Sequence, residues 1–299
     1  MSDVAERVLA LPPHQQALLL RQLKRKTAPP EAEPPSTEEQ RDRWIIRFRP
    51  QAEARMRLFC FAYAGGGASM FRPWSHGLPA DIEVCAIQLP GRENRMGEAA
   101  HTSMALLLTD LAAAIAPYLD RPFAFFGHSM GALVSFELAR ELRRSHDRHP
   151  FGLYLGAFRA PQLPNPNIRI HHLPVEVFKV VLEAEGIPRA ILQNEELMQR
   201  MMTTLRADFE VCDTYHYRKE APLECPLWVF GGQDDIRVRP DDLEGWSAHT
   251  TASCELSILP GTHFFVHSAQ ERLLDIITQS LLAQLSFAAN PTLVDGTPA

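Results

Sequence analysis

A serine, an aspartate and a histidine lie far apart in the chain, and each follows a short apolar run that predicts a buried strand. Ser129 lies in the G-x-S-x-G pattern Gly127-His128-Ser129-Met130-Gly131, and Asp235 and His263 follow two later runs. A serine hydroxyl is a poor nucleophile at neutral pH, so it needs a base to take its proton and an acid to orient that base. Because parallel strands end at one edge of a sheet, the three side chains predict nucleophilic acyl chemistry there.

The surroundings of Ser129 distinguish it from a chance G-x-S-x-G match. An apolar run at 123–126 precedes the pattern, and apolar side chains at helical spacing follow it as far as Arg140. The two glycines remove Cβ atoms that would collide where a strand and a helix pass closely. The Met130 amide would then lie at a helix N-terminus, which favours an anion, so it is predicted as one oxyanion donor. We expect His128 to pack or bond locally.

The base and the acid are chosen by their places after the late strands. Of the twelve histidines, His263 directly follows the last predicted strand, with Gly261 to turn the chain, so it is the predicted general base. Asp234 and Asp235 are adjacent, and two adjacent side chains cannot both face the imidazole. Asp235 stands three residues after Gly232, a common spacing for an acid loop, and is favoured, while Asp234 stays the alternative.

A glycine-rich segment follows the first long predicted strand, residues 57–63. It reads Ala64-Gly65-Gly66-Gly67-Ala68-Ser69 and lacks the G-x-x-x-x-G-K-[ST] pattern of a phosphate-binding loop. In a serine hydrolase the loop after this strand supplies the second oxyanion donor, and the Ala64 amide is the candidate. The alternative is a flexible turn without a role in chemistry.

The elements that must position these residues alternate along the chain. Strands are predicted at 57–63, 82–89, 123–126, 151–157, 226–230 and 254–259, with helices at 103–119, after Ser129, at 242–248 and at 269–285. This alternation predicts an α/β fold with a mostly parallel central sheet and helices on both faces. The chain order of serine, acid and histidine is that of the α/β-hydrolase fold.

The alternation is interrupted at about 161–221, where we expect a helical lid inserted between two strands. Helical segments are predicted at 175–185, 190–192 and 195–217, and the last of these is rich in methionine. Methionine-rich faces adapt to varied partners and acyl chains. The alternative is that these side chains pack the lid onto the core.

The two ends of the chain differ in composition from the rest. Residues 1–26 include an apolar stripe after Pro12-Pro13, which predicts a helix that docks a partner, packs on its own domain or frays. Residues 27–43 are rich in proline and glutamate and predict a disordered linker. The main domain is expected at 44–285, with a loose tail at 286–299.

Bulk composition excludes several classes of function. The chain has 299 residues, 45% hydrophobic, and a net charge of -6, which gives no basic surface for nucleic acid. No apolar run is long enough for a membrane span, and the N-terminus has no signal peptide pattern. The five cysteines of the chain form no C-x-x-C pair, so we expect reduced thiols, no metal site and a cytoplasmic protein. A monomer is the default expectation.

Taken together, the motifs resemble those of type II thioesterases, the free-standing editing enzymes of polyketide and nonribosomal peptide synthesis. The resemblance covers about Trp44 to Leu285. The segments that show it are Phe59-Cys60-Phe61-Ala62-Tyr63-Ala64-Gly65-Gly66, Leu89-Pro90-Gly91-Arg92-Glu93, Phe126-Gly127-His128-Ser129-Met130-Gly131-Ala132, Arg206-Ala207-Asp208-Phe209 with Tyr215, and Gly261-Thr262-His263-Phe264-Phe265. Two positions depart from the family: proline usually replaces Ala62, and glycine usually replaces Thr262. Neither departure removes a catalytic atom.

The resemblance implies hydrolysis of acyl thioesters on the phosphopantetheine arm of a carrier protein, with Ser129, His263 and Asp235 as the triad. It implies no cofactor, because the substrate itself carries the phosphopantetheine. The same triad would also serve a carboxylesterase, or an acyltransferase that passes the acyl group to an amine or alcohol. A docking scaffold without activity would depend on residues 1–26 alone, and a complete triad argues against it.

Overall fold

The computed structural model describes residues 43–165, 168–184, 187 and 189–289, and the fold below is the fold of those residues. The docking helix expected within 1–26 lies outside the described residues. So does the linker expected at 27–43, except for its last residue, Arg43, whose guanidinium pairs with Glu98 at 2.5 Å.

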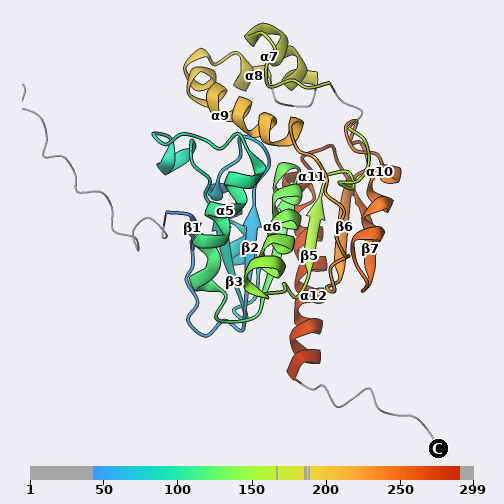
Figure 1. The fold of residues 1–299 in the computed structure, drawn as a ribbon. Coiled ribbons are helices and arrows are strands. Elements are labelled where there is room, and N and C mark those ends of the chain that lie inside the picture. Colours follow the sequence, from blue (N-terminus) through green and yellow to red (C-terminus); the bar gives the residue numbers. More distant parts are fainter. Residues whose placement is uncertain (1–42, 166–167, 185–186, 188, 290–299) are drawn as a thin grey trace, which may run out of the picture. The chain divides into compact units, whose positions relative to one another are not determined.

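A mostly parallel sheet forms the centre of the molecule (Figure 1). Within the described residues its seven strands follow the order β1-β3-β2-β4-β5-β6-β7, and β1 pairs antiparallel with β3 while the other neighbours pair in parallel. The strands are β1 (Ile45–Ile46), β2 (Met56–Phe61), β3 (Ile82–Ile87), β4 (Phe123–His128), β5 (Leu153–Gly156), β6 (Leu227–Gly232) and β7 (Cys254–Leu259). The predicted sheet is confirmed; β1 was not predicted, because two residues show no period.

Helices cover both faces of this sheet, as predicted. The helices are α4 (Trp74–Gly77), α5 (Met104–Ile115), α6 (Met130–His146), α10 (Pro240–Glu244), α11 (Phe265–Ser268) and α12 (Gln270–Ala289). One apolar core joins α5 and α6 to the sheet, and a second joins α4 and α12 to the opposite face. Helix α12 runs past Leu285, where we expected the domain to end; residues 290–299 lie outside the described residues.

Strands β2 to β6 are buried along their whole length, which explains why they read as largely apolar runs, whereas the edge strand β7 is partly exposed. In β4, Phe125 packs in the core with α5 and α6, and its neighbour Phe126 packs in the core with α4 and α12. Both side chains are 0% exposed. Successive side chains of a strand point to opposite faces, so a β4 of this composition needs a helix layer on each side.

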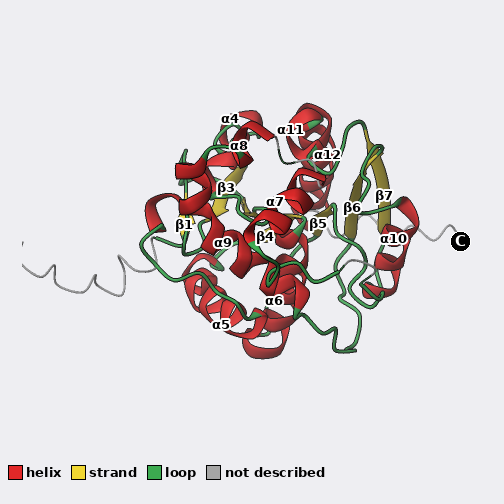
Figure 2. Cartoon of the chain, turned by 90° about the horizontal axis from the view of Figure 1, so that it is seen from above, coloured by secondary structure: helices red, strands yellow, loops and turns green. Residues whose placement is uncertain are grey.

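In the described part of the segment between β5 and β6, the chain forms three α-helices. They are α7 (Val175–Ala184), α8 (Arg189–Leu192) and α9 (Glu195–Asp213), and we call residues 157–226 the insertion. The helices lie above the carboxyl ends of the strands (Figure 1), and α9 crosses over the sheet when seen from above (Figure 2). Helix α9 begins after Asn194, whose side chain accepts a hydrogen bond of 3.0 Å from the Leu197 amide.

The insertion has an apolar cluster of its own. Phe178, Leu182, Met198 and Phe209 are buried in it, and Met201 and Met202 pack against it. These methionines therefore pack within the insertion itself, whereas the simpler interpretation of the methionine-rich run had them pack the lid onto the core.

The described residues contain no helix that could span a membrane. None of the helices in those ranges has both the length and the apolar character that crossing a bilayer requires.

Candidate active site

Ser129 lies in a strained turn between β4 and α6. Its backbone has φ 55° and ψ -120°, a conformation that few residues other than glycine adopt. A Cβ at Gly127 would lie 2.1 Å from the Gly131 carbonyl oxygen, and one at Gly131 would lie 2.2 Å from the Phe61 carbonyl oxygen. The Ser129 amide donates to Gly156 of β5 at 2.8 Å. The strain is therefore held by neighbouring backbone, and only glycine fits on either side.

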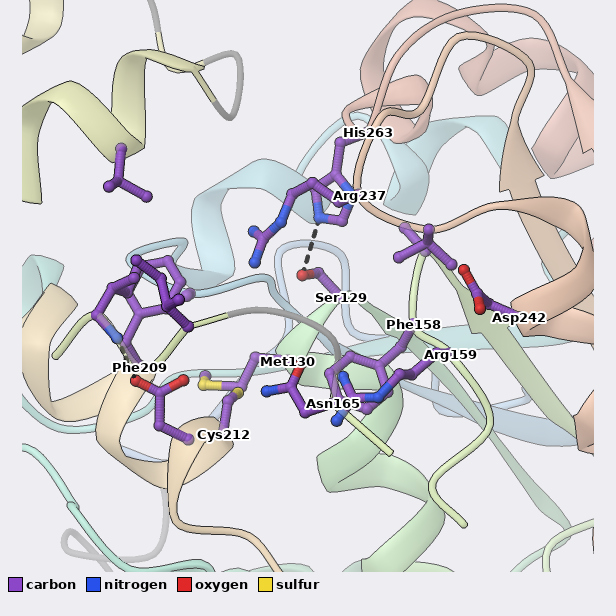
Figure 3. A pocket seen from close by; sticks show the side chains of 17 residues that line it. Ser129, Met130, Phe158, Arg159, Asn165, Phe209, Cys212, Arg237, Asp242 and His263 are labelled. Carbon is purple, nitrogen blue, oxygen red and sulfur yellow. Dashed lines mark hydrogen bonds between the residues drawn. The ribbon is translucent and has the colours of Figure 1, made fainter. Parts of the chain in front are cut away.

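The structure brings Ser129, His263 and Asp235 into one hydrogen-bonded chain (Figure 3 shows the bond to Ser129). The distance from His263 Nε2 to Ser129 Oγ is 3.0 Å, and that from His263 Nδ1 to Asp235 Oδ2 is 2.8 Å. A carboxylate only accepts hydrogen bonds, so Nδ1 carries the proton and donates it. The unprotonated Nε2 then accepts from the serine hydroxyl, as a general base requires.

Asp235 is buried and ionised, and Asp234 is not part of this chain of bonds. Burial raises the pKa of Asp235, but the hydrogen bond and charge of His263 outweigh it and hold the pKa below its usual value. The other carboxylate oxygen accepts from the amides of Arg237 and Val238, at 2.8 and 3.2 Å. The Asp234 side chain is exposed. Of the two candidates, Asp235 is the one that contacts the imidazole.

His128 has a role that the sequence did not predict. Its ring is 0% exposed, and Nε2 donates a bond of 2.7 Å to the carbonyl oxygen of His263, so its contact is distant in sequence and not local. Burial, with the nearby His263, lowers the pKa of His128 to about 3. A neutral His128 thus supports the loop that carries the base. The G-x-S-x-G pattern has no signal for this contact, since its variable positions are unrestricted.

The two predicted oxyanion donors lie in the wall of the same cavity as Ser129 and His263. Met130 is the first residue of α6, where free amides and the helix dipole favour negative charge. Ala64 follows β2 in a turn closed by the Gly66 amide and the Tyr63 carbonyl at 2.8 Å. Donors of this kind stabilise charge that develops on a carbonyl oxygen.

A cavity of about 160 Å³ opens beside Ser129 and is walled partly by the insertion (Figure 3). Its apolar wall includes Phe158, Ile170, Val181 and Phe209. Arginine side chains also reach it: the Arg237 guanidinium lies 5.9 Å from the Phe209 ring, and that of Arg159 lies 5.4 Å from the Phe158 ring. Burial lowers the pKa of Arg159 below its ordinary value. The cavity therefore combines apolar walls with charged side chains of both signs, since Asp213 and Asp242 also line it.

The described ranges of the chain offer no cluster of metal-ligating side chains. Among the residues that the structure describes, no three His, Cys, Asp or Glu side chains come together as a metal-binding group. The hydrogen-bonded chain of serine, histidine and aspartate by itself can form and hydrolyse an acyl-enzyme.

Comparison with known proteins places these features in a family. The family model described as "Thioesterase domain" matches residues 56–281. The chain is 45% identical over 247 residues to a protein named linear gramicidin dehydrogenase LgrE of Brevibacillus parabrevis, covering 81% of this chain and 94% of that protein. It is 42% identical over 241 residues to the gramicidin S biosynthesis protein GrsT of Aneurinibacillus migulanus, covering 80% of this chain and 94% of that protein.

A solved structure shows the same relationship in three dimensions. The type II thioesterase BorB from the borrelidin biosynthetic cluster superimposes with a TM-score of 0.74 and 31% sequence identity. The match covers 80% of this chain and 97% of that one. The α/β-hydrolase architecture expected from the order of strands, helices and motifs is thereby confirmed.

Proposed function

The chain belongs to the thioesterase family and is a thioester hydrolase, and from this premise we propose that it removes acyl groups from the phosphopantetheine thiol of carrier proteins in nonribosomal peptide or polyketide synthesis. The observation that best supports the proposal is the bond of 3.0 Å between His263 and Ser129 beside a cavity that can hold an acyl group. Relatives from gramicidin S and borrelidin biosynthesis support the setting.

We assign the first half of the reaction to Ser129 and His263. The Ser129 oxygen adds to the thioester carbonyl while His263 Nε2 takes the hydroxyl proton. The carbonyl oxygen becomes an oxyanion that accepts from the Ala64 and Met130 amides. The carbon–sulfur bond then breaks, and the imidazolium returns its proton to the departing sulfur as the free thiol.

The second half repeats these steps with water. His263 takes a proton from a water molecule, and the resulting hydroxide adds to the acyl carbon of the ester on Ser129. The intermediate collapses to a carboxylic acid, and the serine oxygen regains a proton from the imidazolium. Asp235 stabilises that imidazolium in both halves, because its lowered pKa keeps it ionised beside the ring.

The size of the cavity favours short acyl groups. A cavity of about 160 Å³ is close to the ~150 Å³ that accommodates benzene in an engineered protein core. Acyl groups of about six non-hydrogen atoms therefore fit without movement of the insertion. We infer that a short acyl group stalled on a carrier protein would be accepted by this cavity.

One relative carries the name of a dehydrogenase, which is a different class of reaction. The sequence fingerprint of a nicotinamide-binding Rossmann fold is G-x-G-x-x-G, and that pattern does not occur in the 299 residues. Serine, histidine and aspartate in one hydrogen-bonded chain are suited to acyl transfer and not to hydride transfer. We therefore propose hydrolysis for this chain.

The test compares two substrates for the purified full chain. One is an acyl carrier protein loaded with acetyl-phosphopantetheine, and the other is p-nitrophenyl acetate. We expect a higher kcat/KM for the carrier-bound thioester. Equal or lower kcat/KM for the carrier-bound substrate would reject the editing proposal in favour of a general esterase.

A variant separates the assigned nucleophile from background hydrolysis. Ser129→Ala should lower kcat by at least about 10⁴-fold, because loss of a triad serine removes covalent catalysis. Binding of the loaded carrier, measured by calorimetry, should stay within about twofold, since no carrier contact is assigned to the hydroxyl. Turnover at the wild-type rate would show that another residue is the nucleophile.

A further inference from the structure

A buried ion pair joins the insertion to the loop that follows β3. Arg92, in that loop, contacts Asp208 of α9 through both guanidinium ends: Nη1 to Oδ2 at 2.9 Å and Nη2 to Oδ1 at 2.7 Å. The two residues are 5% and 3% exposed. A buried carboxylate is costly unless it is paired, so Asp208 is held in one position as long as Arg92 faces it.

The same carboxylate reaches the loop that carries a proposed oxyanion donor. Its Oδ2 accepts a bond of 2.7 Å from the Gly65 amide, and Arg92 Nη1 donates to the Gly66 carbonyl at 3.2 Å. The ion pair therefore bonds to both glycines after Ala64, one through an N–H group and the other through a C=O group. This loop lies at the end of β2, far in sequence from α9.

These bonds bear on the direction of the Ala64 amide. Residues 63–66 form a turn whose third residue, Gly65, has φ 76°, as a type II turn requires. The peptide group between Ala64 and Gly65 can rotate in such a turn. The Gly65 N–H belongs to that peptide group, so its hydrogen bond to Asp208 sets the orientation of the group. Because that amide and the Ala64 amide flank the same Cα atom, fixing one restricts the other.

Helix α9 also packs on this turn. A Cβ at Gly65 would lie 2.6 Å from Leu205 Cδ2, so the helix occupies the space beside the glycine. One residue earlier on α9, Thr204 donates from Oγ1 to the carbonyl of Gly91, in the loop after β3 that also carries Arg92. Thr204 thus holds α9 to the core without bonding to the turn at 63–66, and it offers a matched control for Asp208.

We propose that Asp208 is a positioning residue for the oxyanion hole: from helix α9 of the insertion, together with Arg92, it holds the turn at 63–66 so that the Ala64 amide faces the reacting carbonyl. The inference rests on the proposed function only in that Ala64 is assigned there as a donor. It couples the insertion to the chemistry, because the donor is aligned only while α9 is packed on the turn.

The decisive variant is Asp208→Asn, which keeps the shape of the side chain. The carboxylate accepts from three N–H groups, whereas asparagine has one acceptor oxygen and presents an NH₂ group to at least one of those donors. We expect kcat for acetyl N-acetylcysteamine thioester to fall about 10- to 100-fold, less than or similar to the loss of a whole oxyanion donor. KM should stay within about twofold.

A transition-state mimic separates alignment of the donor from general loss of structure. A trifluoromethyl ketone adds to the nucleophile as a hemiketal whose oxygen occupies the oxyanion site. Its Ki should rise in Asp208→Asn by about the factor by which kcat falls. A fall in kcat with an unchanged Ki would overturn the proposal, and so would an unchanged kcat.

Thr204→Val is the matched control on the same face of α9. It removes a buried hydrogen bond between α9 and the core, and we expect kcat and Ki within about threefold of wild type. Equal losses in Thr204→Val and Asp208→Asn would show that docking of α9, and not the carboxylate, is responsible. If thermal unfolding shows that Asp208→Asn is not folded, kcat and Ki are measured on Arg92→Lys instead. Lysine keeps the positive charge but cannot bond to both carboxylate oxygens as arginine does, so the same losses are expected.

The small thioester keeps this test independent of the natural substrate. If the carrier-protein proposal fails, the preference between substrates differs from the one expected. The ratio of kcat in the variant to kcat in the wild type, measured on the small thioester, would not be affected. A failure of the positioning proposal would leave that ratio near one on both substrates.

Discussion

The sheet and the insertion are built differently, although both contribute to the cavity. In β4 every residue is buried, and Phe125 is enclosed by the rings of Phe59, Phe61 and Phe123 at 5.3 to 5.8 Å between centroids. In α7 only Phe178 and Leu182 are buried, and apolar residues remain exposed: Val175 by 42%, Val177 by 46% and Val180 by 65%. The sheet is a two-sided core, whereas α7 has one packed side.

The two regions also contribute different parts of the site. Ser129, Asp235 and His263 all follow strands of the sheet, where backbone and core packing fix them. The insertion supplies cavity wall, including Val181 and Phe209. The triad residues, which need accurate alignment, therefore stand on the layer with the two-sided core, which we call the rigid layer, while part of the cavity wall stands on a layer with less buried packing. Helix α9 is where the two layers meet.

The largest expected effect lies in the rigid layer, at the acid loop. Asp235→Asn should lower kcat about 10⁴-fold, because the amide no longer holds the Nδ1–H tautomer of His263. The matched variant Asp234→Asn, one residue away and exposed, should stay within about twofold. Steady-state kinetics on one thioester measures both. Comparable losses of kcat in the two variants would reject the assignment of Asp235 as the acid.

Two phenylalanines of opposite layers test the packing itself. Phe125→Ala should destabilise the whole fold by about 3–5 kcal/mol and lower the thermal midpoint by about 10 °C, because it leaves a cavity in a two-sided core. Phe178→Ala, equally buried but in the cluster of the insertion, should mainly speed amide exchange in α7 and α9. Calorimetry and hydrogen exchange distinguish them. An equal fall in midpoint would mean that the insertion and the sheet unfold as one unit.

Acid should act on the sheet layer through two buried histidines. Burial lowers the pKa of His128 to about 3, and burial with the nearby Arg140 lowers that of His249 to about 4. As the pH falls below about 6.5, the unfolded chain takes up protons that the native protein does not. Stability therefore falls with falling pH, by up to about 1.4 kcal/mol per pH unit for each histidine.

Urea unfolding at pH 7, 6 and 5 measures this slope. His249→Phe removes one of the two groups and should reduce the slope by about half; the ring keeps its apolar neighbours Phe136 and Trp246. A slope that is unchanged in the variant would show that other groups control the acid response. The absolute stability of the variant does not enter the comparison, because only its change with pH is read.

The smallest effect is expected on the open side of α7. Val180→Ala should change the free energy of unfolding by less than about 0.5 kcal/mol, since the side chain is 65% exposed and its loss leaves no cavity. A thermal shift assay of Val180→Ala, run in parallel with Phe178→Ala, measures this effect. A loss as large as that of Phe178→Ala would mean that this side of α7 is covered in solution, and the contrast between the layers would then be smaller than described.

Strand runs and motif order were sufficient to predict the sheet, its two helix layers, the serine, the histidine and the loop that carries the acid. A strand buried on both faces is apolar along most of its length, so β2 to β6 are visible in the sequence although β2 and β3 carry the buried pair Arg57 and Glu83. The two-residue strand β1 and the length of α12 were not predictable, because pairing and packing with distant residues set them. The expected docking helix at 1–26 stays a prediction.

Chemical type and order of residues were decided by the sequence itself: a serine between glycines, then an acid, then a histidine, each after a strand. Only the tertiary structure decided between Asp234 and Asp235, since the choice depends on which side chain a loop turns toward His263. It alone brought His128 to the His263 carbonyl and Asp208 to the Gly65 amide. Local patterns report on neighbours in the chain, whereas these hydrogen bonds join residues that only the assembled sheet and the packed insertion bring within 3 Å.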